Sequence, residues 1–178
     1  MDIYFVTGNA DKLREAEQIL RVKLKSAKLE LEEIQGLDSD KIAEHKAKQA
    51  WSLIQKPLVI WDQSLYIHCL NDFPGPLIKW FWEKVSLEKI CQIANFFNDY
   101  EISTKTTLTY YDGTRIEHFY GEVYGTIPSK PRGTNGFAWD PIFIPRGYDR
   151  TFAEMTPEEK NAISMHKIAL ERLRDFLS

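Results

Sequence analysis

The hydrophobic period of this chain changes near residue 100, and that change constrains the fold more than any other feature. Before it, short apolar runs alternate with stretches whose apolar residues recur at helical spacing. After it, residues 102–111 and 116–124 are rich in Thr, Tyr and Phe and flank the turn pair Asp112-Gly113, which predicts an antiparallel hairpin with one wet face. Strands and helices followed by a hairpin predict a mixed α/β fold with a partly antiparallel sheet.

Periodicity and turn residues place the other elements. We expect strands at residues 3–7, 58–60 and 142–144, a half-exposed strand at 29–31, and an extended continuation at 65–70. We expect helices at residues 13–20, 41–54, 77–84, 87–97 and 157–176. The last of these has Thr156 as its predicted N-cap and Pro157 in its first turn.

The length of 178 residues predicts one domain spanning 1–178, and 43% hydrophobic residues suffice for a sizeable core. A formal charge of -3 provides no overall basic field, so neither nucleic acid nor a membrane is an expected partner. Cys69 and Cys91 are too few for a secreted disulfide framework, which favours free thiols. Without a signal sequence or a membrane-length apolar run, the expected location is the cytoplasm.

One candidate anion site follows the first strand. Thr7-Gly8-Asn9 joins it to a helix whose free N–H groups favour phosphate, and Lys12 adds a positive charge. The segment matches neither the GxxxxGK[ST] phosphate loop nor the GxGxxG dinucleotide pattern. The alternative is that Asn9 only caps the helix and Lys12 is solvated.

Two carboxylates, Glu33 and Asp62, lie at expected strand ends, where α/β sheets bind ligands, and their oxygens suit Mg²⁺. The alternative is that both are solvated loop charges. Lys79 lies at the head of a helix among aromatic residues, an unfavourable place for a cation unless an anion binds there. In the alternative, Trp80 belongs to the core and Lys79 reaches past it to solvent.

A third group of candidates lies late in the chain. Phe137 offers a ring on which a planar base can stack, with Trp139 and Asp140 in the same glycine-flanked turn. The alternative is an aromatic turn that only fills the core. In the expected helix 157–176, Lys160, Ser164 and Lys167 share one face by their spacing, as either ligand contacts or a solvated surface.

Taken together, the chain resembles the inosine triphosphate pyrophosphatase family almost from end to end. The resemblance rests on five ordered motifs: Thr7-Gly8-Asn9 with Lys12; Glu33-Ile34-Gln35-Gly36; Phe73-Pro74-Gly75-Pro76 with Ile78-Lys79-Trp80-Phe81; Gly136-Phe137-Ala138-Trp139-Asp140-Pro141-Ile142-Phe143; and Thr151-Phe152-Ala153-Glu154-Met155 with Glu159-Lys160-Asn161. It implies an elongated, two-lobed mixed sheet flanked by helices, a nucleotide cleft between the lobes, and usually a homodimer.

The resemblance also implies a reaction, the Mg²⁺-dependent hydrolysis of non-standard purine nucleoside triphosphates to monophosphate and pyrophosphate. It implies that Glu33 and Asp62 hold the metal and that Asp62 and Lys46 are catalytic, with Asp62 acting on the attacking water. The implied phosphate contacts are Thr7, Asn9, Lys12, Lys46, Lys79 and Lys160. The implied base and sugar contacts are Phe137, Trp139, Asp140 and Ser164, and we add His166 as a candidate.

The chain departs from the family pattern twice. It has Trp61-Asp62-Gln63-Ser64 where the family usually has Glu-Asp-Thr/Ser-Gly, and Ser164-Met165-His166 where the family usually has Ser-His-Arg. The usual donors to the 6-oxo group of the base therefore have no direct equivalents, which predicts altered or relaxed base preference. The alternative function is a nucleotide-binding protein with little or no catalysis, suggested by Trp61 beside Asp62.

Overall fold

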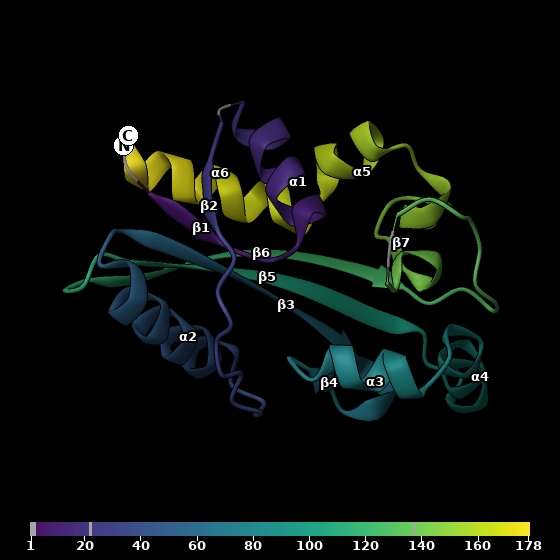
Figure 1. Ribbon diagram of the computed structural model, residues 1–178. Coiled ribbons are helices and arrows are strands. Elements are labelled where there is room, and N and C mark those ends of the chain that lie inside the picture. The colour runs from purple at the N-terminus through teal and green to yellow at the C-terminus, as the bar shows by residue number, and fades with distance from the viewer. Residues whose placement is uncertain (1–2, 22, 137) are drawn as a thin grey trace. The chain divides into compact units, whose positions relative to one another are not determined.

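The computed structural model describes residues 3–21, 23–136 and 138–178, with the Asp11 side chain left out (Figure 1). Within them it is a mixed α/β protein, as predicted, with a seven-stranded sheet in the order β2-β1-β3-β5-β6-β7 and β4 paired to β3. The strands are β1 (Tyr4–Val6), β2 (Lys25–Ala27), β3 (Leu58–Ile67), β4 (Phe73–Gly75), β5 (Glu101–Tyr111), β6 (Ile116–Thr126) and β7 (Ile144–Pro145). The α-helices are α1 (Ala10–Leu20), α2 (Ser39–Ile54), α3 (Ile78–Lys84), α4 (Leu87–Phe97), α5 (Pro157–Ile163) and α6 (Met165–Leu177).

The chain divides into two compact units, and it enters each of them more than once. The first unit is Met1–Gln63, Thr106–Gly121 and Met165–Ser178. The second is Ser64–Lys105 and Glu122–Ser164. The single domain over residues 1–178 stays a prediction.

In the first unit, the pleat of β1 and β3 divides the core into two layers. β1 is parallel to both β2 and β3. Phe5, Val59 and Trp61 pack with residues of α1 and α6 on one face of the sheet, while Leu58 and Ile60 pack with alanines of α2 on the other. Figure 1 shows α1 and α6 side by side on the face opposite α2. Since neighbours along a strand point to opposite faces, Gln63 follows Trp61 toward α1 and α6.

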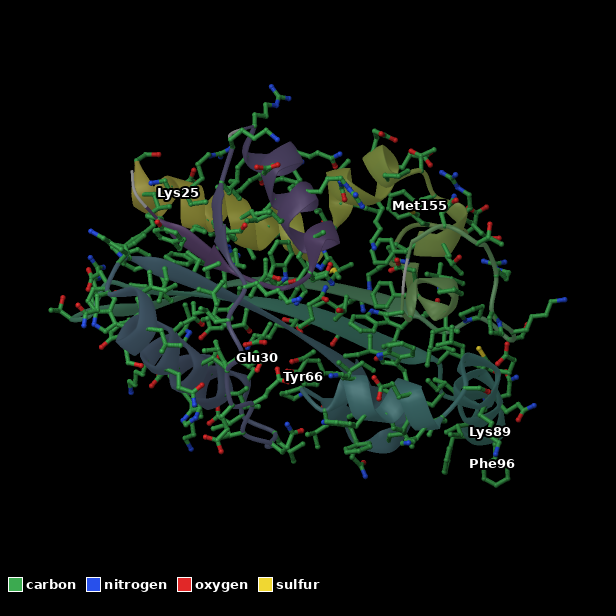
Figure 2. The ribbon with its side chains drawn as sticks, in the orientation of Figure 1. Lys25, Glu30, Tyr66, Lys89, Phe96 and Met155 are labelled. Atoms are coloured by element: carbon green, nitrogen blue, oxygen red, sulfur yellow. The ribbon has the colours of Figure 1, made fainter. Side chains whose placement is uncertain are left out.

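In the second unit, β4 pairs antiparallel with β3 and β7 antiparallel with β6. The rings of Phe143 and Phe152 are buried and stacked, with centroids 5.0 Å apart. Phe96, by contrast, projects from α4 and is 83% exposed (Figure 2). Cys69 and Cys91 are free thiols, as predicted.

The sequence predicted one early strand in the wrong place. Residues 29–31 are not in a strand, and β2 lies upstream at Lys25–Ala27. Leu29 and Leu31 pack against the core cluster that contains Val6 and Ile60. Their alternation therefore reflects burial of one side of an extended segment, without a strand partner.

The strand predicted at residues 58–60 is longer than expected and continues as β3 to Ile67. Asp62 is therefore inside a strand, and the prediction that it follows a strand end was wrong. The short strand predicted at 142–144 also shifts, because a 3₁₀ turn occupies Asp140–Ile142 and β7 begins at Ile144.

The hairpin forms about the turn at Asp112, but the prediction of one wet face holds only for part of it. Glu122, Tyr124 and Thr126 of β6 are exposed at alternate positions, whereas the prediction was wrong for the middle of β5. Four threonines of β5 are at most 1% exposed: Thr104, Thr106, Thr107 and Thr109. β5 lies between β3 and β6 in the sheet, and Thr106 to Tyr110 are buried without alternation. Such a run indicates a strand covered on both faces.

The single helix predicted at 157–176 is two helices. Ser164 has extended backbone angles, φ -74° and ψ 154°, and separates α5 from α6. The α5 start is as predicted, since Thr156 caps it and Glu159 completes a capping box. Because helical spacing does not continue through Ser164, the prediction that Lys160, Ser164 and Lys167 share one helix face was wrong.

None of the helices in the described ranges is long and apolar enough to cross a membrane.

Gly121 allows α6 to approach β6, which gives a first prediction. A Cβ added there would lie 1.8 Å from the Met165 carbonyl oxygen. We expect Gly121→Ala to lower the free energy of unfolding by ~1–3 kcal/mol, because the backbone of α6 must move to make room for the methyl group. Urea denaturation measures this, with Gly36→Ala as control because a Cβ at Gly36 meets nothing within 4 Å. Equal stability of the two variants would contradict the prediction.

Candidate functional site

The first part of the site lies where the parallel pairing of β1 with β3 ends, at Val6 opposite Ile60. The chain then turns through Thr7, whose Oγ1 accepts a hydrogen bond from the Asn9 N–H at 3.0 Å. Asn9 Oδ1 accepts from the Lys12 N–H at 3.3 Å, so Asn9 does cap α1. The carboxyl end of parallel strands is where α/β sheets bind ligands.

Lys12 is not a solvated side chain, in contrast to the alternative raised from the sequence. Its Nζ donates to the Trp61 carbonyl oxygen at 3.0 Å and lies 5.8 Å from the centre of the indole ring. Burial lowers the pKa of Lys12; Asp62 opposes this shift, and the ammonium of Lys46 adds to it. The cost of desolvating this cation is typical of a functional position.

Glu33, Lys46 and Asp62 form the charged centre of the first unit. Lys46 projects from α2, and its Nζ donates to Asp62 Oδ1 at 2.5 Å and to the Glu33 carboxylate. Burial by itself would lower the pKa of Lys46, but Asp62 and Glu33 together raise it. The structure thus brings three of the predicted site residues into direct contact, and neither carboxylate is a lone solvated loop charge.

The oxygen atoms of this cluster suit a hard divalent cation. Asp62 Oδ2 is buried and has no hydrogen-bond partner within residues 3–21, 23–136 and 138–178, so it is available as a ligand atom. No group of three or more His, Cys, Asp and Glu residues converges within the described ranges. Mg²⁺ is commonly held by one or two carboxylates, with phosphate oxygens and water as its other ligands, and Glu33 with Asp62 fits that pattern.

His166 lies next to this centre in a network that the sequence did not predict. Its side chain is 0% exposed, and its Nδ1 is 2.6 Å from Glu15 Oε1. Its Nε2 contacts the Gln63 side-chain amide, and its ring packs edge-on against Trp61 with centroids 5.0 Å apart. Glu15 and Gln63 are thus additional residues of the site. In the sequence, only the three-residue spacing of Lys12 and Glu15 on one helix indicated that Glu15 lies near the site.

In the second unit, Asp140 and Lys160 form a buried ion pair. Lys160 Nζ donates to Asp140 Oδ2 at 2.7 Å, and it also lies 5.6 Å from the centre of the Phe152 ring. Gly136 makes room for the carboxylate, because a Cβ there would lie 2.0 Å from Asp140 Oδ2. A buried pair with both partners present avoids the large penalty of an isolated charge.

The other predicted residues of the second unit lie in different surroundings. Trp139 is buried, and its Nε1 has no hydrogen-bond partner among the residues that the structure describes, while Ser164 is buried at the end of α5. Lys79 lies in the first turn of α3, exposed, 5.2 Å from the centre of the Trp80 ring. Trp80 is 49% exposed, so the alternative that it belongs to the core was wrong. Phe137 lies outside the described residues.

The fold and the charged centre together define a mixed α/β protein with a candidate site beside the end of the parallel pairing of β1 with β3, around Asp62 inside β3. Comparison with known proteins names the family. Residues 3–176 match the model of the Ham1 family, and the chain belongs to that family.

Individual relatives match over almost their whole lengths. The inosine triphosphate pyrophosphatase of Yarrowia lipolytica is 41% identical, covering 100% of this chain and 96% of the relative. The dITP/XTP pyrophosphatase of Thermococcus kodakarensis is 36% identical, covering 99% and 97%. The structure of a HAM1 protein from Coxiella burnetii superimposes with a TM-score of 0.87 at 29% identity, covering 98% and 97%. The family predicted from the motifs is therefore confirmed.

The lowered pKa of Lys12 predicts how this site binds a polyanion as pH changes. The charged ammonium attracts the anion, so affinity for inorganic tripolyphosphate is kept below that pKa and lost as pH rises through it. Arginine stays charged, so Lys12→Arg should move the loss to higher pH. Calorimetric titration of both proteins between about pH 7 and pH 10 tests this, because the titration of the ligand itself cancels in the comparison. Identical pH profiles would contradict the prediction.

Proposed function

We propose that this chain hydrolyses non-standard purine nucleoside triphosphates, such as ITP, dITP and XTP, to the monophosphate and pyrophosphate. Relatives that match it from end to end are named inosine triphosphate pyrophosphatase and dITP/XTP pyrophosphatase. The observation that carries the proposal is the contact of Lys46 with both Glu33 and Asp62, next to Lys12. The products require cleavage of the anhydride between the α- and β-phosphates.

In the proposed mechanism, Asp62 orients the attacking water and accepts its proton. Its Oδ1 is held by Lys46 at 2.5 Å, while Oδ2 has no partner in the described part of the chain. One carboxylate thus has one fixed oxygen and one that can take a ligand or a proton. A positioned general base contributes ~10²–10⁴-fold to a rate.

Lysines provide the positive charge that phosphoryl transfer needs, since positioning and charge stabilisation account for most of its catalysis. We assign Lys12 and Lys46 of the first unit to the triphosphate, with Thr7 and Asn9 at the turn before α1. We assign Glu33 and Asp62 to Mg²⁺, which when bound would neutralise charge developing on the phosphate oxygens. By family membership, Lys79 and Lys160 of the second unit are further phosphate contacts.

The base and sugar contacts are proposed on the second unit. Phe137 and Trp139 provide aromatic rings, and the Trp139 Nε1 is a buried donor for which the described residues offer no partner. Asp140 and Ser164 provide polar contacts to the nucleoside. His166 has both ring nitrogens engaged within the protein, so we do not assign it a contact with the base. Without donors at the positions usual in the family, we propose a relaxed preference between purine bases.

We also propose that the protein acts in the cytoplasm as a homodimer. The homodimer is carried over from the family resemblance, and the cytoplasm from the expectation drawn from the sequence.

Release of pyrophosphate from a panel of ribo- and deoxyribonucleoside triphosphates with Mg²⁺ tests the function. We expect turnover of ITP, dITP and XTP, and Asp62→Asn should lower kcat by ~10²-fold or more because it removes the base. Thermal unfolding serves as the control for folding. Wild-type turnover that survives Asp62→Asn would refute the assigned role, and absence of turnover for every substrate would refute the function.

A nucleotide-binding protein with little catalysis is the second candidate, and one observation favours it. Trp61, a large indole packed in the core, directly precedes Asp62. In that case nucleotides would raise the midpoint of thermal unfolding by mass action without any release of pyrophosphate. Efficient turnover with loss on Asp62→Asn would eliminate it.

A further inference from the structure

We propose that Glu15, His166 and Gln63 form a buried bridge that positions Lys12 for the triphosphate, so that His166 is a positioning residue. The kinetic consequences of this bridge rest on the proposed function. The bridge itself is a feature of the first unit, where all of these residues lie.

The hydrogen-bonding roles along the bridge follow from chemistry. The Gln63 amide nitrogen only donates, so the His166 Nε2 that it contacts accepts. A neutral imidazole that accepts at Nε2 carries its proton on Nδ1, which donates to Glu15 Oε1 at 2.6 Å. Both ring nitrogens are thus used, and the side chain is 0% exposed. His166 therefore has no free donor for a base.

The bridge connects two elements that carry the charges of the site. Glu15 lies one helical turn after Lys12 on α1, and Gln63 directly follows Asp62 on β3. Lys12 provides a second connection between the same elements, through its 3.0 Å hydrogen bond to the Trp61 carbonyl. Two polar connections one turn apart fix the beginning of α1 against the segment of β3 that holds Asp62.

Trp61 completes this arrangement as a spacer. The Lys12 ammonium lies 5.8 Å from the centre of the Trp61 ring, and the His166 ring packs against it in a T-shaped arrangement with centroids 5.0 Å apart. The indole is 5% exposed, and its Nε1 has no hydrogen-bond partner among the described residues, so it acts here through its shape and its π surface. Because Trp61 and Gln63 share a strand face, the ring of His166 contacts both.

A positioning role and a base-contact role make different kinetic predictions. If the start of α1 is no longer held in place, Lys12 binds the triphosphate more weakly. The triphosphate is common to all nucleoside triphosphates. The weaker binding therefore lowers activity by a common factor for all bases. Losing a contact to the base instead changes the ranking of ITP, XTP and ATP.

The test uses His166→Phe, which keeps the ring and removes both hydrogen bonds, together with Gln63→Leu and the double variant. We expect kcat/KM to fall ~10-fold for ITP, XTP and ATP alike, the size typical of losing a partner that orients a site residue. The double variant should be no worse than His166→Phe, since both changes break one bridge. Affinity for inorganic tripolyphosphate should fall by a similar factor.

The matched control is His118→Phe in the same unit, where a half-buried histidine contacts Thr109 and Glu44. We expect His118→Phe to leave the affinity for tripolyphosphate unchanged, even if it lowers the midpoint of thermal unfolding. If His166→Phe alters the base ranking, or leaves tripolyphosphate affinity unchanged, the bridge is refuted. If His166→Phe does not fold, Gln63→Leu at a half-buried position answers the question alone. If the wild type turns over nothing, the proposed function fails, while the tripolyphosphate titration still decides the bridge.

Discussion

The organisation of the first unit depends on the pleat of β3 across three consecutive residues. Trp61 and Gln63 face α1 and α6, while Asp62 alternates with them and meets Lys46 of α2. A strand that is covered on both faces can therefore present a carboxylate to one layer and a supporting network to the other. Moving the register by one residue would exchange the two sets and separate Asp62 from its lysine.

Burial is offset differently at the two lysines of this centre. Lys46 is buried and Lys12 is half-buried, and burial disfavours the charged form of each. For Lys46 the two carboxylates overcome that cost, whereas for Lys12 they do not, and its pKa stays lowered. Fold stability does not require a cation that is left partly uncompensated. An arriving polyanion would compensate it, which links this imbalance to the binding of phosphate.

The sequence predicted most of the helices and strands, and it named Glu33, Lys46 and Asp62 as site residues. It did not predict the boundaries of the elements or the network of Glu15, His166 and Gln63. The strand, turn and capped helix around Asn9 are local, so periodicity and capping chemistry were sufficient for them. The break at Ser164 was missed because residues 157–176 keep an apolar helical period on both sides of it. The threonines of β5 were misjudged because burial depends on strands distant in the sequence. The pairing of His166 with Glu15 spans 151 positions, which no local pattern specifies.

The break at Ser164 gives the two departures from the family pattern a common physical meaning. Because the helix is interrupted there, Lys160 and Ser164 belong to the second unit and His166 to the first. His166 therefore shares its surroundings with Trp61 and Gln63, two of the other residues that depart from the pattern, and contacts both. A large indole beside Asp62 removes an acidic side chain, but it also provides the surface against which His166 packs. Three of the residues that depart from the family pattern, from two distant segments of the chain, thus pack together in the first unit.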